Sequence, residues 1–319
     1  MGGYLQQIRS RVGSQKVLLV FGCALIRDEQ GRILWQRRGD FGWWGLTGGM
    51  LELDESLPQC AVREAREETG LQVQPVRLVG LYTSPDFDVV YPNGDQVQQI
   101  TACFECRPTG GTLQIDRDET LELNWHAPDD LPDTAIWYQA MIADLLRESN
   151  DCFYQQGGPG LRASTQPYYR WLRQYIGPQP YIGPAAVAFI QNEAGHVLLQ
   201  RRGDTGEWGV PGGGMELGER IDQTLIHEVE EETGLRVQPR RLIGLYSDAD
   251  FWVTYHGREQ LKGVSALFAC QVTGGSLHPD GDETLELRYF APDNLPPLAP
   301  RYLRLVQDGL ANAPGAVFK

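Results

Sequence analysis

The sequence predicts two tandem copies of one α/β domain, each with a mixed β-sheet flanked by helices. Three observations lead to this prediction. The 319 residues suit two domains of about 150 residues, a size at which a domain buries roughly two-thirds of its unfolded surface. The two halves repeat each other position by position. Within each half, strand-like apolar runs alternate with helical segments, as in layered folds.

The repeat has a constant register. Adding 164 to a residue number in the first half gives the matching position in the second half, without an insertion or deletion. A shared register of this length indicates duplication of a whole domain rather than a solenoid of short units. The matched segments include Tyr4 and Tyr168, 36–40 and 200–204, 80–82 and 244–246, and 118–123 and 282–287.

The join between the copies is expected within 149–167. This stretch contains Gly157-Gly158-Pro159-Gly160 and several polar residues, a composition typical of linkers. We therefore assign residues 1–155 to the first domain, 156–167 to a linker and 168–319 to the second domain. Phe153 and Tyr154 predict that the segment before the linker packs against a domain.

Each half carries the same order of elements. A turn at Gly31 separates two apolar strands in the first half, and Gly195 does so in the second, so we predict a hairpin in each copy. In the first half we predict an amphipathic opening segment at 4–12, strands at 17–26, 33–36, 77–82, 88–91, 100–107 and 121–126, and a last helix at 135–147. The second half repeats the opening segment at 168–176 and the first two strands at 185–190 and 197–200.

The central helix of the first half is predicted to begin after Ser56. Serine is a favourable N-cap, and Pro58 is tolerated in the first turn because that turn does not need its N–H. The apolar stripe of this helix, at helical spacing, is Leu57, Cys60, Ala61 and Ala65.

Composition and charge narrow the class of protein. Hydrophobic residues make up 41% and charged residues 22% of the chain, as in soluble globular proteins. The net charge of −14 argues against a surface for duplex nucleic acid or an anionic membrane, since either would need a basic face. No apolar run approaches the length of a membrane span and no secretory signal is visible, so we expect a cytoplasmic protein.

The positions of the cysteines do not indicate a disulfide pattern shared by the two halves. Five of the 6 lie in the first half, so two equivalent halves cannot share a set of disulfides. Cys103 and Cys106 have C-x-x-C spacing, but no second pair exists to complete a zinc site. In a strand this odd spacing points the two side chains to opposite faces. We expect six unpaired thiols.

The most specific pattern is the stretch 49–71, which recurs at 213–235. The first copy combines Glu55, Arg63, three further glutamates and the ending Gly70-Leu71 at fixed spacing. The second copy differs at Arg63, where it has His227, and it retains Glu219, Glu228, Glu231, Glu232, Gly234 and Leu235. This spacing resembles the signature box of the Nudix hydrolases, which cleave a nucleoside diphosphate linked to another group. The chain thus resembles a tandem Nudix protein, and the resemblance implies an α/β/α sandwich in each half.

The three glutamates after Arg63 share one helical face. Glu64, Glu67 and Glu68 lie at i, i+3 and i+4, a spacing at which like charges repel by a few tenths of a kcal/mol per pair. A hard cation with oxygen ligands, Mg²⁺ or Mn²⁺, would relieve this repulsion. The alternative is a solvated acidic face; the complete box in two copies favours metal binding.

The resemblance also implies roles for particular residues. The three acids of this face would bind the metal, with the backbone of Gly48 lending a carbonyl oxygen. Family members often add a carboxylate from a later loop, a place matched by Glu119 with Glu122 as a competitor. The implied metal-binding and catalytic residues are Gly48, Glu64, Glu67, Glu68 and Glu119 in the first domain and Gly212, Glu228, Glu231, Glu232 and Glu283 in the second.

Basic and aromatic residues before the box are candidates for substrate binding. Bidentate donors at the end of a strand suit phosphate oxygens, although pairing with local acids is equally consistent for at least one arginine of each pair. Tryptophans there can stack on a base, but we favour packing. The arginines are Arg37, Arg38, Arg201 and Arg202, and the tryptophans are Trp43, Trp44 and Trp208.

The two boxes are not equivalent. Arg63 is interpreted as a catalytic-site residue that clamps Glu55 and fixes the loop. His227 in its place is mostly neutral at pH 7 and has no bidentate fork, while Glu230 adds a negative charge nearby. Losing such a supporting contact often costs about 10- to 100-fold in activity. The hypothesis is that both halves bind metal and the first carries most of the turnover.

The reaction implied by the resemblance is Mg²⁺-dependent hydrolysis, in which activated water attacks a diphosphate phosphorus. Candidate substrates are nucleoside triphosphates, nucleotide sugars such as ADP-ribose, dinucleoside polyphosphates and capped RNA ends. A hypothesis of another class is a non-catalytic sensor or scaffold that binds a nucleotide, at least in the second domain. The two domains are expected to form a monomer with a pseudo-twofold axis, or a homodimer.

Overall fold

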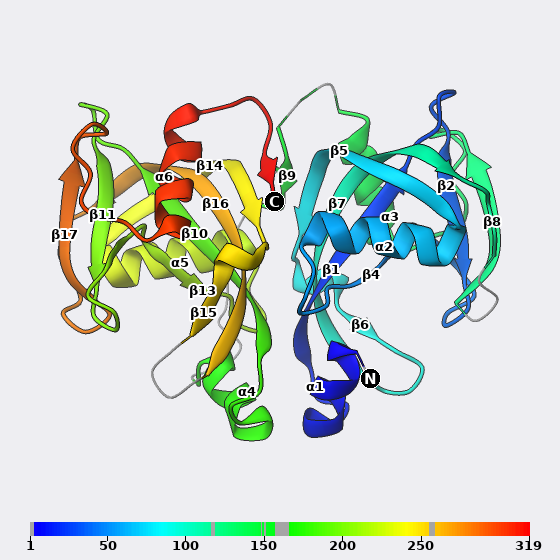
Figure 1. Cartoon of the computed structure of the whole chain (residues 1–319), viewed down its shortest axis with the longest axis horizontal. Coiled ribbons are helices and arrows are strands. Elements are labelled where there is room, and N and C mark those ends of the chain that lie inside the picture. Colours follow the sequence, from blue (N-terminus) through cyan, green and yellow to red (C-terminus); the bar gives the residue numbers. More distant parts are fainter. Residues whose placement is uncertain (1–2, 116–118, 148, 150, 157–165, 255–258) are drawn as a thin grey trace.

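The computed structural model describes residues 3–115, 119–147, 149, 151–156, 166–254 and 259–319. Its two halves lie side by side and repeat one another (Figure 1). The first half contains α1 (Tyr4–Val12), β1 (Val17–Ile26), β2 (Ile33–Arg38), β3 (Trp44–Gly45), β4 (Thr47–Met50), α2 (Leu57–Thr69), β5 (Leu71–Tyr82), η1 (Pro85–Phe87), β6 (Val89–Val90), β7 (Gln96–Gly111), β8 (Thr120–His126), α3 (Ile136–Leu145) and β9 (Phe153–Tyr154). The second half contains α4 (Tyr168–Ile176), β10 (Tyr181–Ile190), β11 (Val197–Arg202), β12 (Trp208–Gly209), β13 (Gly212–Gly214), α5 (Ile221–Thr233), β14 (Leu235–Tyr246), η2 (Ala249–Phe251), β15 (Trp252–Thr254), β16 (Gln260–Gly275), β17 (Thr284–Phe290), α6 (Pro300–Ala311) and β18 (Val317–Phe318).

Each half is built on two sheets. In the first half β1 pairs in parallel with β7 and antiparallel with β4, and this sheet continues through β5 to β9. β2 forms a separate sheet with β3 and β8, and the second half repeats both sheets strand for strand. Residues 23–26 of β1 alternate between two apolar clusters, one shared with α2 and the other with α3. Mixed pairing and helices on both faces confirm the predicted fold class.

The predicted hairpins are wrong. Within the described residues no ladder pairs β1 with β2 or β10 with β11. Just after β1 there is an isolated antiparallel bridge between Arg27 and Ile33, and just after β10 there is one between Gln191 and Val197. The reason is that β1 has both edges occupied, by β4 and by β7. β2 therefore leaves the Gly31 turn and starts the second sheet, where Ile33 is fully buried.

Several strands are longer than predicted. The strand expected at 77–82 begins directly after Gly70, and the strand expected at 100–107 spans Gln96–Gly111. The first additional residues of β5 alternate between buried and exposed, as Val73 and Gln74 do, so they are strand residues with a solvated face. The apolar runs in the sequence marked only the fully buried part of each strand.

The central helix α2 forms as predicted. Ser56 stands at its N-cap, where the N–H of Ser56 donates to Oε1 of Gln59 at 2.7 Å, and Pro58 lies in the first turn. Gly70 ends the helix in the left-handed conformation, with φ of 73°. The predicted apolar stripe is buried, and two acids of the box, Glu64 and Glu68, are buried with it.

The two halves dock through reciprocal contacts. The hydroxyl oxygen of Tyr4 accepts the N–H of Ile182 at 2.9 Å, and the matching Tyr168 accepts the N–H of Leu18 at 3.0 Å. One apolar cluster runs through both halves, and α1 and α4 lie next to each other at the same end of the interface (Figure 1). The domains are therefore related by a pseudo-twofold axis.

The segments near the join and the cysteines agree with the sequence. Phe153 and Tyr154 form β9, which pairs in parallel with β5, and the ring of Tyr154 contacts Phe268 of the second half. Residues 157–165 of the predicted linker lie outside the described residues. All six cysteines are free thiols, and Cys103 and Cys106 enter different apolar clusters on opposite faces of β7.

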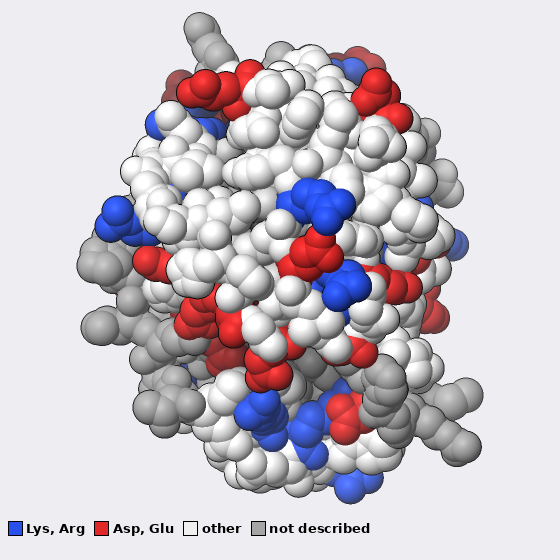
Figure 2. Space-filling view, turned by 90° about the vertical axis from the view of Figure 1, so that its left-hand side faces the viewer, with Lys and Arg blue, Asp and Glu red and all other residues white. Residues whose placement is uncertain are grey.

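The end of the molecule formed by the second half carries mixed charge. Figure 2 shows basic and acidic side chains interspersed on this face, without a continuous basic surface among the residues described there. β17 at this end carries an ion pair between Arg288 and Glu286 at 2.7 Å. Within the described part of the chain, the helices are all too short or too polar to cross a membrane.

Candidate functional site

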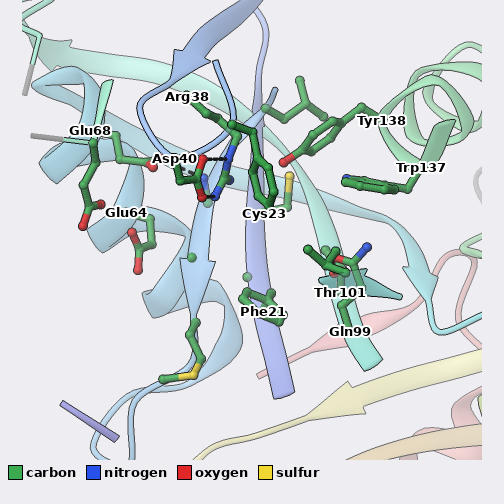
Figure 3. Close-up of a pocket in the computed structure, with 18 of the residues that line it drawn as sticks. Phe21, Cys23, Arg38, Asp40, Glu64, Glu68, Gln99, Thr101, Trp137 and Tyr138 are labelled. Carbon is green, nitrogen blue, oxygen red and sulfur yellow. Dashed lines mark hydrogen bonds and ion pairs between the residues drawn. The ribbon is translucent and has the colours of Figure 1, made fainter. Parts of the chain in front are cut away.

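A cleft of about 560 Å³ lies in the first domain beside α2 (Figure 3). Glu64 and Glu68 of α2 line one side of it, together with the glycines of β4. Trp137 and Tyr138 of α3 line the other side, and Arg38, at the end of β2, lies between them. The cleft thus combines acidic, basic and aromatic walls drawn from three separate elements.

Glu68 is held by two neutral donors. Nε2 of Gln36 and the N–H of Gly48 each donate to its carboxylate at 2.9 Å. Burial raises the pKa of Glu68 to about 8, although these two hydrogen bonds partly oppose the shift. Burial also raises the pKa of Glu64, against the opposing charge of Arg63. Both carboxylates are therefore in surroundings that disfavour their charge unless a cation lies beside them.

Arg63 pairs with Glu55, as predicted, and connects the loop before α2 to the acidic face of the helix. Its guanidinium forms a bidentate pair with Glu55, through Nε at 2.8 Å and Nη2 at 2.6 Å. Nη1 also donates to Glu64 at 2.6 Å and to Glu67 at 3.0 Å, and Nη2 donates to the carbonyl of Met50 at 3.1 Å. One side chain thus fixes the loop before α2 relative to the acidic face.

The three acids of the box do not converge on one point. Glu64 and Glu68 line the cleft, whereas the side chain of Glu67 is 58% exposed and lies outside that lining. Within the described residues, no three His, Cys, Asp or Glu side chains are grouped so as to hold a metal. The N–H of Gly48 donates to Glu68. The role predicted for its carbonyl oxygen as a metal ligand stays a prediction.

The two arginines of the first domain are separated. Arg38 lines the cleft and forms a bidentate pair with Asp40, at 2.9 Å through Nε and 2.6 Å through Nη2. Arg37 lies outside that lining and donates from Nε to the carbonyl of Gly42 at 3.1 Å. Only one arginine of this pair is therefore placed to meet a substrate in the cleft.

The later loop brings Glu119 to the site. Glu119 lines the cleft, and its charge contributes to the raised pKa of Glu64. Its competitor Glu122 lies on β8, opposite Arg37 in the strand register. The geometry thus favours Glu119 over Glu122.

An aromatic group forms one end of the cleft. The rings of Phe41 and Trp43 stack at 4.5 Å with 17° between their planes, and Phe41 contacts Tyr91 at 5.4 Å. Trp137 meets Trp43 edge-on at 6.0 Å. All four line the cleft, whereas Trp44 and Trp208 pack against the apolar clusters of their domains. We call Phe41, Trp43, Tyr91 and Trp137 the aromatic group.

The second domain repeats the acidic arrangement. Nε2 of Gln200 and the N–H of Gly212 donate to Glu232 at 3.0 and 2.7 Å, and burial raises the pKa of Glu232 to about 7. A Cβ added to Gly213 would lie 2.2 Å from Oε2 of Glu228, as one added to Gly49 would from Glu64. Of the other predicted acids, Glu231 is exposed, and the charge of Glu283 contributes to the raised pKa of Glu232. Of the predicted arginines, Arg201 lies 3.8 Å from Glu286, and Arg202 pairs with Asp204 at 2.8 Å.

The second domain differs from the first at the residue that holds the box glutamate and at the positions that match Trp43 and Trp137. Glu219 is fully buried and is held by Nδ1 of His227 at 2.7 Å and by the hydroxyl of Thr224 at 2.7 Å. At the positions that match Trp43 and Trp137, the second domain has Glu207 and Arg301, which form an ion pair at 3.4 Å. The aromatic contact between Trp43 and Trp137 in the first domain is thus replaced by an ion pair at the matching positions of the second.

Sequence comparisons with known proteins identify the family of this chain. The model of the NUDIX domain family matches residues 17–145 and 182–309. The chain is a tandem NUDIX-domain pyrophosphohydrolase. It is 35% identical over 119 residues to a MutT-like protein of Streptomyces ambofaciens, covering 37% of this chain and 70% of the relative. It is 31% identical over 132 residues to an ADP-ribose pyrophosphatase of Methanocaldococcus jannaschii, covering 40% and 74%. A crystal structure of an ADP-ribose pyrophosphatase from Streptococcus suis aligns with 24% identity and a TM-score of 0.36, covering 43% of this chain and 98% of that one.

Sequence reasoning about the NUDIX site missed several side chains. Gln36 and Gln200 were part of the repeated motif before the box, and their identity in both copies was a usable signal. Three members of the aromatic group carried no signal, because Phe41, Tyr91 and Trp137 lie far apart in the sequence. They come together only through the packing of α3 and the β6–β7 turn onto the main sheet.

Proposed function

We propose that the first NUDIX domain hydrolyses a nucleoside diphosphate linked to another moiety, with Mg²⁺ or Mn²⁺ as the required cation. The observation that carries this proposal is the pair of buried glutamates, Glu64 and Glu68, in a cleft that also presents Arg38 and the aromatic group. Acids on one side and aromatic rings on the other match a substrate that is a polyphosphate at one end and a base at the other.

The donor set fits a divalent cation with a preference for oxygen. The carboxylates of Glu64 and Glu68 are buried with raised pKa values, and a bound cation would stabilise their charged form. A Cβ at position 49 would lie 2.2 Å from Oε1 of Glu64, so only glycine allows the strand to come this close. The residues proposed to hold the cation are Gly48, Glu64, Glu67, Glu68 and Glu119, and, in the second domain, Gly212, Glu228, Glu231, Glu232 and Glu283.

Each residue contributes a defined task in this proposal. The bound cation would neutralise the diphosphate and lower the pKa of the attacking water. A carboxylate of the acidic face, or Glu119 across the cleft, accepts the proton of that water. Arg38 turns from Asp40 to the phosphate oxygens, and Arg63 keeps the loop and the acids in register. Arg202, which pairs with Asp204 as Arg38 does with Asp40, is proposed for the same task in the second domain. Arg37 lies outside the cleft lining and is not assigned a substrate contact, nor is Arg201, which matches it in the second domain.

The aromatic group is proposed to bind the base of the substrate. Trp137→Ala is expected to raise KM about tenfold while changing kcat less, because stacking on one base is worth about 1–3 kcal/mol. Initial rates over a range of substrate concentrations measure both constants. The matched control is Arg301→Ala at the same position of the second domain, which leaves KM unchanged. A Trp137→Ala enzyme with unaltered KM would contradict the assignment of the base.

A panel of nucleotides tests the proposed activity. Nucleoside triphosphates, ADP-ribose and other nucleotide sugars, dinucleoside polyphosphates and NAD-capped RNA are incubated with the protein and Mg²⁺, and the released nucleotide is identified. We expect cleavage at a diphosphate of at least one substrate class, and complete loss of cleavage when EDTA removes the cation. A second candidate function, binding without turnover, predicts that a nucleotide protects the protein thermally while no member of the panel is cleaved.

A further inference from the structure

The loop that precedes each box helix is held by a buried side chain from the opposite domain. In the first domain this loop runs from Leu51 to Ser56. Lys262 of β16, in the second domain, is 1% exposed and donates from Nζ to the carbonyl of Glu52 at 2.7 Å. The same ammonium also donates to the carbonyl of Glu55. A side chain of the second domain thus fixes two backbone carbonyls of the first domain's catalytic loop.

The matching position in the first domain has the same task and a different side chain. Gln98 of β7 is fully buried, donates from Nε2 to the carbonyl of Glu219 at 2.7 Å and accepts the N–H of Gly218 at 2.7 Å. Position 98 therefore supports the second domain's loop with a neutral amide, and position 262 supports the first domain's loop with a charge. The interface is symmetric in geometry and asymmetric in electrostatics.

The start of each box helix is held across the interface as well. The N–H of Leu57 donates to Oγ of Ser247 at 2.8 Å, and the N–H of Ile221 donates to Oγ1 of Thr83 at 3.0 Å. Each helix N-terminus thus finds a partner for one of its free N–H groups in the other domain. The loop and the first turn of α2 are both attached to the second domain.

A short chain of hydrogen bonds connects Lys262 to the glutamates of the acidic face. Glu55, whose carbonyl meets Lys262, holds Arg63 with its carboxylate, and Arg63 holds Glu64 and Glu67. The ammonium also faces the acidic side chains of Glu52 and Asp54 on this loop. Removing the ammonium would take away a positive charge that faces the three acids of this loop, Glu52, Asp54 and Glu55.

We propose that Lys262 of the second domain is a positioning residue for hydrolysis in the first domain. It holds the loop that sets Arg63 and the box glutamates, so the second domain serves the first as a structural activator in addition to any turnover of its own. This inference rests on the proposed activity of the first domain.

The test uses the full chain carrying Glu231→Gln, so that the measured turnover belongs to the first domain. Lys262→Met keeps the length of the side chain and removes the ammonium; we expect kcat to fall about 10- to 100-fold with KM within about twofold. Lys262→Gln restores the side chain found at the matching position 98 and is expected to give an intermediate kcat. The matched control is Lys16→Gln, which removes a surface lysine paired with Asp88 and leaves kcat within about twofold.

The outcomes separate the proposals. A graded loss of kcat, with Lys262→Gln above Lys262→Met and the Mg²⁺ activation curve shifted to higher concentrations, supports positioning. A kcat within about twofold of the parent in Lys262→Met overturns it, as does an equal loss in both variants. If Lys262→Met does not fold, Lys262→Gln alone decides, since unchanged kcat in that folded variant also overturns the inference. A parent chain without turnover contradicts the proposed function instead.

Discussion

Glu67→Gln is expected to lower the turnover of the whole chain by about 10²- to 10³-fold, whereas Glu231→Gln lowers it by less than about twofold. The two residues occupy matching positions of the two boxes, so the comparison tests which domain carries the reaction. The side chain of Glu67 is 58% exposed, so its replacement removes a carboxylate without disturbing the core. The measurement is kcat with the best substrate of the panel at saturating Mg²⁺.

Glu122→Gln provides the control for a lost carboxylate in the first domain. Glu122 lies on β8 outside the lining of the cleft, and we expect kcat within about twofold of the unmodified chain. Equal losses of kcat in Glu67→Gln and Glu231→Gln would contradict the proposal that the first domain carries most of the turnover. A large loss in Glu231→Gln alone would assign the turnover to the second domain.

The asymmetry has a physical origin in the clamp residue. Two nitrogens of Arg63 donate to the carboxylate of Glu55, and the third donates to Glu64 and Glu67. Its charge is permanent. His227 meets Glu219 through one ring nitrogen and has no fork with which to bridge the acids of its own box. The domains also differ away from the clamp, since the first has the aromatic group and the second has the ion pair of Glu207 and Arg301 at the positions that match Trp43 and Trp137.

Much of the fold could be predicted because its determinants are local. The repeat fixed the number of domains, Ser56 and Gly70 marked the ends of α2, and helical spacing placed the box acids on one face. The hairpins were wrong because strand pairing depends on which edges of β1 are occupied, and that is set by β4 and β7, more than twenty residues away. Local spacing carries no record of such competition.

The site shows the same limit more sharply. Glycine and glutamate spacing located Glu64, Glu68 and Gly48, because these residues lie close together in the chain. The partners of the site are distant: Gln36 reaches Glu68 across 32 positions, and Lys262 reaches Glu55 across 207 positions. Such contacts depend on the docking of sheets and domains, which a single sequence does not display.

His227→Arg is expected to raise turnover by the second domain about 10- to 100-fold when the first domain is silenced by Glu67→Gln. An arginine at 227 can form the bidentate pair that Arg63 forms with Glu55 and can supply a permanent positive charge to the acidic face. The measurement is kcat in the double variant, relative to Glu67→Gln alone. His227→Gln is the control, since it removes the imidazole without adding a charge or a fork and is expected to give no gain.

Thr224 decides how fully that gain is realised. Its hydroxyl donates to Oε2 of Glu219 at 2.7 Å and the N–H of Glu216 donates to the same oxygen at 3.4 Å, so a guanidinium would be a third donor to an oxygen with two lone pairs. The first domain has Cys60 at the matching position, and its thiol is directed to the carbonyl of Gly49 instead. Adding Thr224→Cys should therefore raise kcat beyond His227→Arg alone. If neither change moves kcat by more than about twofold, the clamp is not what limits the second domain. The ion pair of Glu207 and Arg301, which stands where the first domain has Trp43 and Trp137, then becomes the determinant to change.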